Sequence, residues 1–255
     1  MVFYFTGTGN SLYVAKHLDD ECFSIPQELK KENLEYTSET IGIICPNHGH
    51  EMPPQVREFI KRATFNTKYL YIVITFGNDQ GGAAEIAYRY CLSVGKYPNY
   101  VVSLEMTDTF IPIFSLKDQL EKDKHELENI GFIKGGIERR VNFVQRASSL
   151  DKFIHWFYSL VVRKQDAKIW ARFKLTDNCT GCSICSKVCP GKCITIVDGK
   201  PVRNNENCQA CFACLNACPR KAIKLDGPLP DKNPNLRYRN RYIELDEIIN
   251  SNNQY

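Results

Sequence analysis

Eight of the twelve cysteines form two copies of one pattern, in which cysteines separated by two, two and three residues are followed by proline. The copies run from Cys179 to Pro190 and from Cys208 to Pro219, so each position of the first corresponds to the position 29 residues later. Three closely spaced thiolates can bind one cubic 4Fe-4S cluster, whereas the fourth lies too far along the chain and reaches the other cluster. We therefore expect one cluster to take Cys179, Cys182, Cys185 and Cys218, and the other to take Cys208, Cys211, Cys214 and Cys189.

Other chemistries of cysteine fit this pattern less well. A single C-x2-C pair also occurs in zinc sites and redox dithiols, but two registered copies that each end in proline favour iron-sulfur clusters. Disulfide frameworks are typical of small secreted chains. Residues 1–5 predict a strand and show neither the basic start nor the cleavable apolar run of a secretory signal peptide, so a disulfide framework is not expected. The apolar run 153–162 contains His155 and is too short to span a bilayer. We expect a cytoplasmic protein with reduced thiols and no membrane span.

Charge is distributed unevenly along the chain, whose formal net charge is +4. Residues 1–150 contain 16 Lys and Arg against 19 Asp and Glu, whereas residues 151–255 contain 17 against 10. The basic second half fits either an acidic or phosphate-bearing partner or a solvated lysine-rich face. No basic cluster is interleaved with stacking aromatic residues, so the sequence does not indicate nucleic-acid binding.

Residues 1–18 show the pattern of a strand, a turn rich in glycine and hydroxyl groups, and a helix. Glycines allow the backbone to approach a phosphate closely, and the N-terminus of a helix offers unpaired N–H groups. The spacing is not the dinucleotide fingerprint, because Leu12 stands at the third glycine position, and the Walker lysine is missing. The predicted phosphate contacts are Thr6, Gly7, Thr8, Gly9, Asn10 and Ser11.

Strands and helices continue to alternate to about residue 105, which predicts a parallel sheet covered on both faces. Five strands are expected, at residues 1–5, 22–25, 41–44, 69–76 and 100–105. Three loops, at residues 6–11, 46–52 and 76–82, follow strand ends. Ligands of open α/β sheets bind at the carboxyl ends of the strands, so these loops are candidates for one site.

Two resemblances connect these patterns. The cysteine motifs resemble those of bacterial two-cluster ferredoxins, and the loop at residues 6–11 looks like the FMN-phosphate loop of flavodoxins. Over nearly the whole chain, TGTGNS at 6–11, MPP at 52–54, the cysteine motifs and RYRN at 237–240 resemble the fused flavodoxin and ferredoxin proteins of anaerobic bacteria. The resemblance implies FMN, two 4Fe-4S clusters and a flavodoxin-like doubly wound sheet with strand order 2-1-3-4-5.

By this resemblance, the loops at 46–52 and 76–82 flank the isoalloxazine ring of FMN. The predicted contacts are backbone contacts at Gly49 and Gly77, stacking by His48, His50 or Phe76, and hydrogen bonds to ring heteroatoms from Asn47 and Asn78, with Pro46 and Gly82 bordering the site. Each of these positions is also compatible with an ordinary loop residue.

The region between the two motif-bearing parts is expected to be a helical linker. Residues 115–128 read as a charged, solvated helix, and an apolar stripe from Phe153 to Phe173 predicts a helix packed between the domains, with membrane-surface binding as the alternative. Residues 106–114 are a candidate wall of the flavin site. The predicted domains are 1–114 flavodoxin-like, 115–174 linker, 175–227 small α+β two-cluster ferredoxin, and 228–255 a C-terminal tail with a short helix at 245–250.

A second repeat follows the cysteine motifs. Residues 192–200 and 221–227 both predict hairpin strands that close on an Asp-Gly turn. In this alignment Cys193 corresponds to Ala222, so we interpret Cys193 as a small buried residue and not as a ligand.

Flavin and clusters on one chain predict electron transfer, because FMN accepts two electrons and each cluster carries one. The leading hypothesis is an electron carrier that exchanges electrons with redox protein partners. The alternative is a flavin-dependent reductase of a small substrate, for which His48 and His50 are the only acid-base candidates. A redox sensor is a third hypothesis.

Overall fold

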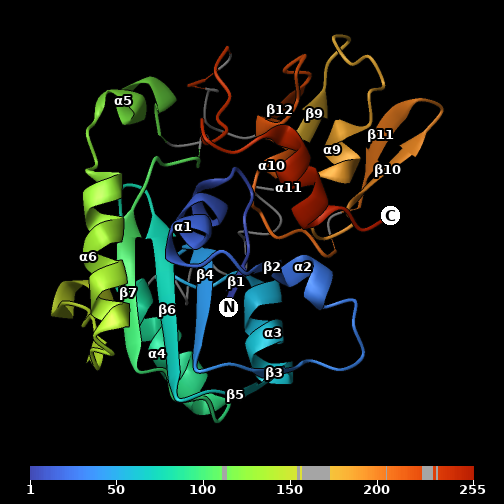
Figure 1. The fold of residues 1–255 in the computed structure, drawn as a ribbon. Helices are drawn as coiled ribbons and strands as arrows, with labels where there is room; N and C mark the ends of the chain where they lie inside the picture. Colours follow the sequence, from blue (N-terminus) through green and yellow to red (C-terminus); the bar gives the residue numbers. More distant parts are fainter. Residues whose placement is uncertain (111–113, 154–155, 157–172, 205, 226–231, 234) are drawn as a thin grey trace.

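The computed structural model describes residues 1–110, 114–153, 156, 173–204, 206–225, 232–233 and 235–255. A parallel sheet with helices on both faces forms one part of the molecule, and the cysteine-rich region packs beyond one end of its strands (Figure 1).

The main sheet contains six parallel strands in the order β2-β1-β4-β6-β7-β8. Their bounds are β1 Val2–Tyr4, β2 Cys22–Ser24, β4 Thr40–Pro46, β6 Tyr69–Phe76, β7 Tyr100–Glu105 and β8 Phe143–Val144. The predicted parallel α/β sheet is confirmed, but the expected number of five strands is wrong. The sixth strand, β8, has two residues and pairs with β7, so it is too short for a period to appear in the sequence. Strands β3 (Glu35–Thr37) and β5 (Thr64–Asn66) form a separate parallel pair.

Helices cover both faces of the sheet. Alternate strand residues face opposite sides, so Val2 and Tyr4 enter one apolar core and Phe3 and Phe5 enter the other. The first core is covered by α1 (Asn10–Leu18) and α6 (Glu126–Glu138), and the second by α3 (Pro54–Arg62) and α4 (Ala83–Ser93). Burial on both faces explains why the parallel strands are apolar along their whole length.

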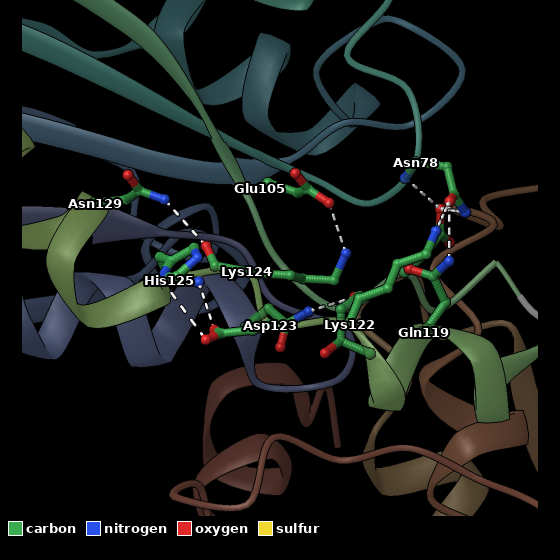
Figure 2. A network of polar contacts seen from close by, with 11 residues as sticks. Asn78, Glu105, Gln119, Lys122, Asp123, Lys124, His125 and Asn129 are labelled. Atoms are coloured by element: carbon green, nitrogen blue, oxygen red, sulfur yellow. Dashed lines mark hydrogen bonds and ion pairs between the residues drawn. The ribbon is translucent and has the colours of Figure 1, made fainter.

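The predicted helix at 115–128 is wrong, because the chain forms two helices there. Helix α5 (Leu116–Glu121) ends before α6 begins, and the connection contains a buried lysine. The Lys124 side chain is 2% exposed, and its Nζ lies 2.7 Å from Oε1 of Glu105 at the end of β7 (Figure 2). A buried ammonium group requires such a partner, so the break in the helix accompanies the ion pair that fixes the connection to the sheet.

The cysteine-rich region has two short sheets. Its elements are β9 Phe173–Leu175, α9 Ile184–Lys187, β10 Ile194–Val197, β11 Lys200–Arg203, α10 Ala213–Asn216 and β12 Ile223–Leu225. The predicted hairpin at 192–200 is confirmed: β10 pairs with β11, and Asp198 and Gly199 have φ of 49° and 71°, as a type I′ turn requires. In the second predicted hairpin, β12 pairs antiparallel with β9, whereas the expected turn at Asp226 and Gly227 lies outside the described residues.

Most of the predicted linker helix lies outside the described residues, as do residues 111–113 of the candidate wall. Of the apolar stripe, the undescribed members are Phe157, Leu160, Val161, Ile169 and Trp170. Phe153 and Trp156 are more than half exposed, and Phe173 begins β9. In the described part of the chain, no helix is both long enough and apolar enough to cross a membrane.

The segment from residue 235 onward packs against the beginning of the chain. Its helix α11 (Leu245–Asn252) contains the predicted helix at 245–250 and contacts α2 (Ile25–Glu28) (Figure 1). The hydroxyl groups of Ser251 and Tyr4 are 2.8 Å apart, and the fully buried Asn252 donates from Nδ2 to the carbonyl oxygen of Thr6 at 2.9 Å. This segment therefore covers the loop that follows β1.

A pair of tyrosine variants tests this packing. The buried Tyr238 hydroxyl donates to Oδ1 of Asn10 at 2.7 Å, so Tyr238→Phe should lower the free energy of unfolding by about 1 kcal/mol, measured by urea titration of anaerobic protein. Tyr242→Phe is the matched control, because the Tyr242 ring is half exposed and its hydroxyl has no hydrogen bond among the described residues. Equal stability of the two variants would contradict the packing described above.

Candidate functional site

Four of the predicted ligands line one hollow in the cysteine-rich region. These are Cys179, Cys182, Cys185 and Cys218. The first three precede or begin α9, whereas Cys218 follows α10, and the N–H of Ala222 donates to its Sγ at 3.3 Å. The structure thus brings together the set that crossed ligation of the first cluster requires.

The remaining four predicted ligands line a second hollow. These are Cys189, Cys208, Cys211 and Cys214, and a fifth cysteine, Cys193, lines the same hollow. In the described residues, no group of three or more Cys, His, Asp or Glu side chains is placed to hold a single metal ion. The thiols line two hollows, an arrangement that can hold iron-sulfur clusters.

The two halves of the motif repeat have the same backbone conformation. Ser183 and Phe212, which are 29 positions apart, have φ of 63° and 53°, and each stands immediately before a short helix. Side chains other than glycine seldom adopt this left-handed conformation. In both motifs this residue turns the chain into a short helix, and the third cysteine lies in the first turn of that helix, beside its hollow.

The second hollow carries a cation and a proton donor against its thiols. Nη2 of Arg203 donates to Sγ of Cys208 at 2.8 Å, and its guanidinium lies 3.9 Å from the centroid of the Phe173 ring. The nearby Cys193 thiol, first, and the Arg203 cation lower the pKa of Cys208. Cys193 likewise lowers the pKa of Cys189. Low thiol pKa values favour the thiolate form that binds iron.

Burial opposes ionisation at several other thiols. Desolvation raises the pKa of Cys185 to about 11 and that of Cys211 to about 12, and it raises the pKa of Cys214 as well. These thiols must lose their protons when metal binds, so cluster binding releases protons.

The second hollow adjoins the N-terminal loops. A methyl group at Gly7 would lie 2.7 Å from the carbonyl oxygen of Cys211, so only glycine permits this approach. At the first turn of α3, Nε2 of Gln55 donates to the Pro190 carbonyl at 2.8 Å, and its backbone N–H donates to Oε1 of Gln209 at 3.2 Å. His48, in the loop at 46–52, interacts with the backbone of Gln209 as well. The loops at 6–11 and 46–52 and the start of α3 therefore meet the chain that carries Cys189, Cys208 and Cys211.

Most of the predicted phosphate loop is buried. Gly9 has φ of 99° and precedes α1, whose first turn has no side-chain cap, and the N–H groups of Asn10 and Ser11 have no acceptor among the described residues. Buried donors at a helix N-terminus favour an anion. Other groups of the loop are paired: Thr6 Oγ1 accepts from the Gly9 N–H at 3.0 Å, and the Thr8 carbonyl accepts from the Asn240 N–H at 2.9 Å. The donors that remain fit a phosphate.

The two loops predicted to flank the ring contact one another. Nδ2 of Asn47 donates to the carbonyl oxygens of Asp79 and Gln80 at 3.1 Å, and Nε2 of His50 lies 3.1 Å from Oδ2 of Asp79. Two buried atoms in this region, Oδ1 of Asn47 and Nδ1 of His48, have no partner in the described residues. A ligand with both N–H and carbonyl groups fits these atoms.

The predicted stacking and backbone residues occupy varied positions. His48 meets Phe5 edge-on at 6.1 Å and interacts with the backbone of Gln209, and burial lowers its pKa to about 4, so its ring is neutral at pH 7. Three other predicted contacts lie at the ends of elements: Pro46 ends β4, Phe76 ends β6, and Gly82 precedes α4. Gly49 is exposed in the loop between β4 and α3.

Asn78 is held by polar contacts from two other segments (Figure 2). Its Nδ2 donates to Oδ2 of Asp108 at 3.2 Å, and its Oδ1 accepts from Nε2 of Gln119 at 2.9 Å and from Nζ of Lys122 at 3.4 Å. A methyl group at Gly77 would overlap Asp108. The Asn78 amide thus fixes its loop in this structure, and its polar atoms are already engaged by protein groups.

Sequence reasoning missed three residues of the site. Arg203, Gln55 and Tyr238 contact the cysteine-rich region or the N-terminal loop. Arg203 and Gln55 belong to no motif, and Tyr238 lies in the RYRN motif, to which no contact was assigned. Arg203 is the last residue of β11, which belongs to the predicted hairpin. The sequence therefore placed Arg203 near the second motif, although it did not indicate a contact with Cys208.

Comparison with known proteins identifies part of the chain. The family model described as 4Fe-4S dicluster domain matches residues 173–219. A search of curated proteins found no match. The matched residues include both motifs completely and form a 4Fe-4S ferredoxin-type domain, whose chemistry is electron transfer through iron-sulfur clusters.

Arg203 should set the reduction potential of the cluster held at the second hollow. A cation that donates a hydrogen bond to a ligand sulfur stabilises the more negative, reduced cluster. Arg203→Gln should therefore lower one of the cluster potentials by roughly tens of millivolts, measured by an EPR-monitored redox titration.

Lys200→Gln provides the control, because it removes the same charge from the same strand, at an exposed position. A potential that moves equally in both variants would show that net charge alone is responsible.

Proposed function

We propose that this protein transfers electrons between FMN and two 4Fe-4S clusters, and on to or from redox protein partners. The observation that supports this most directly is the contact of the second hollow with the loops at 6–11 and 46–52. The predicted FMN site and the second hollow are then adjacent, and Gly7 lies at the contact between them.

The proposed cluster ligands follow the lining of the two hollows. Cluster one is held by Cys179, Cys182, Cys185 and Cys218, and cluster two by Cys208, Cys211, Cys214 and Cys189. Each motif thus gives its fourth cysteine to the other cluster, as the spacing predicts.

The FMN proposal is supported by the unpaired groups of the N-terminal loops. The N–H groups of Asn10 and Ser11 would hold the phosphate, and Asn47 Oδ1 and His48 Nδ1 would bind polar atoms of the ring. When bound, FMN supplies a carrier that takes up an electron pair and releases electrons singly. The chain's own contribution is to bind and orient the ring and to exclude water from its polar edge.

The two hollows differ in exposure, which suggests an order. Around the second hollow Pro190 and Gly191 are buried, whereas the corresponding Pro219 and Arg220 of the first hollow are exposed, as is Cys182. We therefore assign cluster two as the inner centre, nearest the flavin, and cluster one as the outer centre, where partners dock. The exposed Arg220 and the basic second half favour an acidic partner surface.

The alternative, a flavin-dependent reductase of a small substrate, has less support. Its only acid-base candidates are both engaged by protein groups: His48 by Gln209 and His50 by Asp79. A substrate-level proton donor therefore has no observation in its favour.

Cofactor analysis tests the proposal directly. Protein purified or reconstituted without oxygen should contain about eight irons, about eight sulfides and one FMN per chain. Reduced protein should be reoxidised by an added redox protein, and addition of small oxidisable or reducible metabolites should leave its absorbance unchanged. Eight irons without flavin would remove FMN from the proposal, and rapid reoxidation by a small substrate alone would favour the reductase.

A hydroxyl variant tests the phosphate loop. Thr8 is buried beside the unpaired N–H groups, and its side chain makes no hydrogen bond among the described residues. If this hydroxyl binds the FMN phosphate, Thr8→Val should weaken FMN binding at least about tenfold. Riboflavin, which lacks the phosphate, should bind wild type and variant equally, as measured by flavin fluorescence quenching. Equal FMN affinity would remove Thr8 from the site.

A further inference from the structure

The second hollow contains one thiol more than a 4Fe-4S cluster requires. Cys193 is 4% exposed and lines this hollow together with the four proposed ligands of cluster two. Its Sγ donates to the Gly191 carbonyl oxygen at 3.4 Å and lies close enough to interact with the sulfurs of Cys189 and Cys208. Its backbone N–H also donates to Sγ of Cys189 at 3.2 Å. Cys193 is therefore in direct contact with two proposed ligands, not merely near them in sequence.

The local chain conformation makes room for this thiol. Lys192 has φ of 52°, which turns the chain back toward the motif immediately before Cys193. A methyl group at Gly191 would lie 3.0 Å from Sγ of Cys193 and 2.2 Å from the carbonyl oxygen of Asn207. The absence of a side chain at Gly191 thus permits Cys193 to sit against the second motif.

The first hollow repeats this arrangement without the thiol. Ala222 occupies the position equivalent to Cys193, lines the first hollow and donates its backbone N–H to Sγ of Cys218 at 3.3 Å. Lys221, before it, has φ of 51°. The backbone turn is therefore the same at both sites. The side chains differ at two positions: Ala222 lacks the sulfur of Cys193, and Arg220 stands where the second hollow has Gly191.

We propose that Cys193 is an alternative fourth ligand of cluster two that exchanges with Cys189. In the exchange, the iron–sulfur bond to Cys189 breaks and one to Cys193 forms, and the proton of the Cys193 thiol passes to the released Cys189 thiolate. Iron valence and total charge do not change, so no oxidant or reductant is needed. This inference rests on the proposed two-cluster function and replaces the interpretation of Cys193 as a small structural residue.

The exchange is favoured by burial as well as proximity. Cys189 and Cys193 are both 9% exposed or less, so neither sulfur has to cross water to replace the other. The Arg203 guanidinium donates to Cys208 of the same hollow and compensates thiolate charge there whichever of the two cysteines is bound. Cluster two is thereby protected against loss of one ligand, whereas cluster one has no second thiol at the equivalent position.

The repeat provides its own matched control. Cys189→Ala should retain about eight irons per chain, because Cys193 takes the vacated position, whereas Cys218→Ala should fall to about four. The double variant Cys189→Ala with Cys193→Ala should also fall to about four, and Cys193→Ala alone should retain about eight. Iron and sulfide analysis, together with EPR of the reduced clusters, provides the readout.

A gain-of-ligand variant keeps the test independent of folding defects. Cys218→Ala combined with Arg220→Gly and Ala222→Cys should regain the iron that Cys218→Ala loses, because this variant reproduces both the glycine and the thiol of the second hollow. Cys189→Ala that loses as much iron as Cys218→Ala would overturn the proposal. Wild-type protein with fewer than about eight irons after reconstitution would instead contradict the two-cluster function itself, so the two failures are distinguishable.

Discussion

The arrangement of this molecule depends on the approach of two backbones, at Gly7 and at Cys211. The carbonyl oxygen of Cys211 stands where a side chain of residue 7 would begin, so the first loop of the sheet and a cysteine motif are in van der Waals contact. Gln55 and Gln209 hold the same interface by hydrogen bonds a short distance away. Because these contacts involve backbone atoms, they position the motifs more rigidly than flexible surface side chains would.

Patterns that are local in sequence were predicted well. The cysteine spacing indicated the iron-sulfur domain without any tertiary information, since the ligand pattern lies within two short motifs. The strand β6 was predicted with its observed bounds, because a strand buried on both faces is apolar along its whole length. The Asp198-Gly199 turn was equally recognisable, because its conformation demands particular residues.

Features that depend on distant partners were not predicted. Strand β12 pairs with β9, which precedes both motifs and is therefore distant from β12 in sequence. The break between α5 and α6 accompanies the ion pair of Lys124 with Glu105, which no helical period reveals. For the ring contacts, residue type alone did not show that Asn78 would be engaged by Asp108 and Gln119. The significance of Cys193 also required coordinates, since the repeat alone aligned it with an alanine.

The packing of α11 against the first strand has a consequence for biosynthesis. Ser251 and Asn252 contact Tyr4 and Thr6, so partners at opposite ends of the described chain complete one core. A ribosome releases the cysteine motifs before it releases α11, and domains generally begin to fold as they emerge. The loop at 6–11 therefore stays uncovered while the ferredoxin-type region is already available. The core that Tyr4 and Thr6 share with α11 is therefore completed last among the described elements.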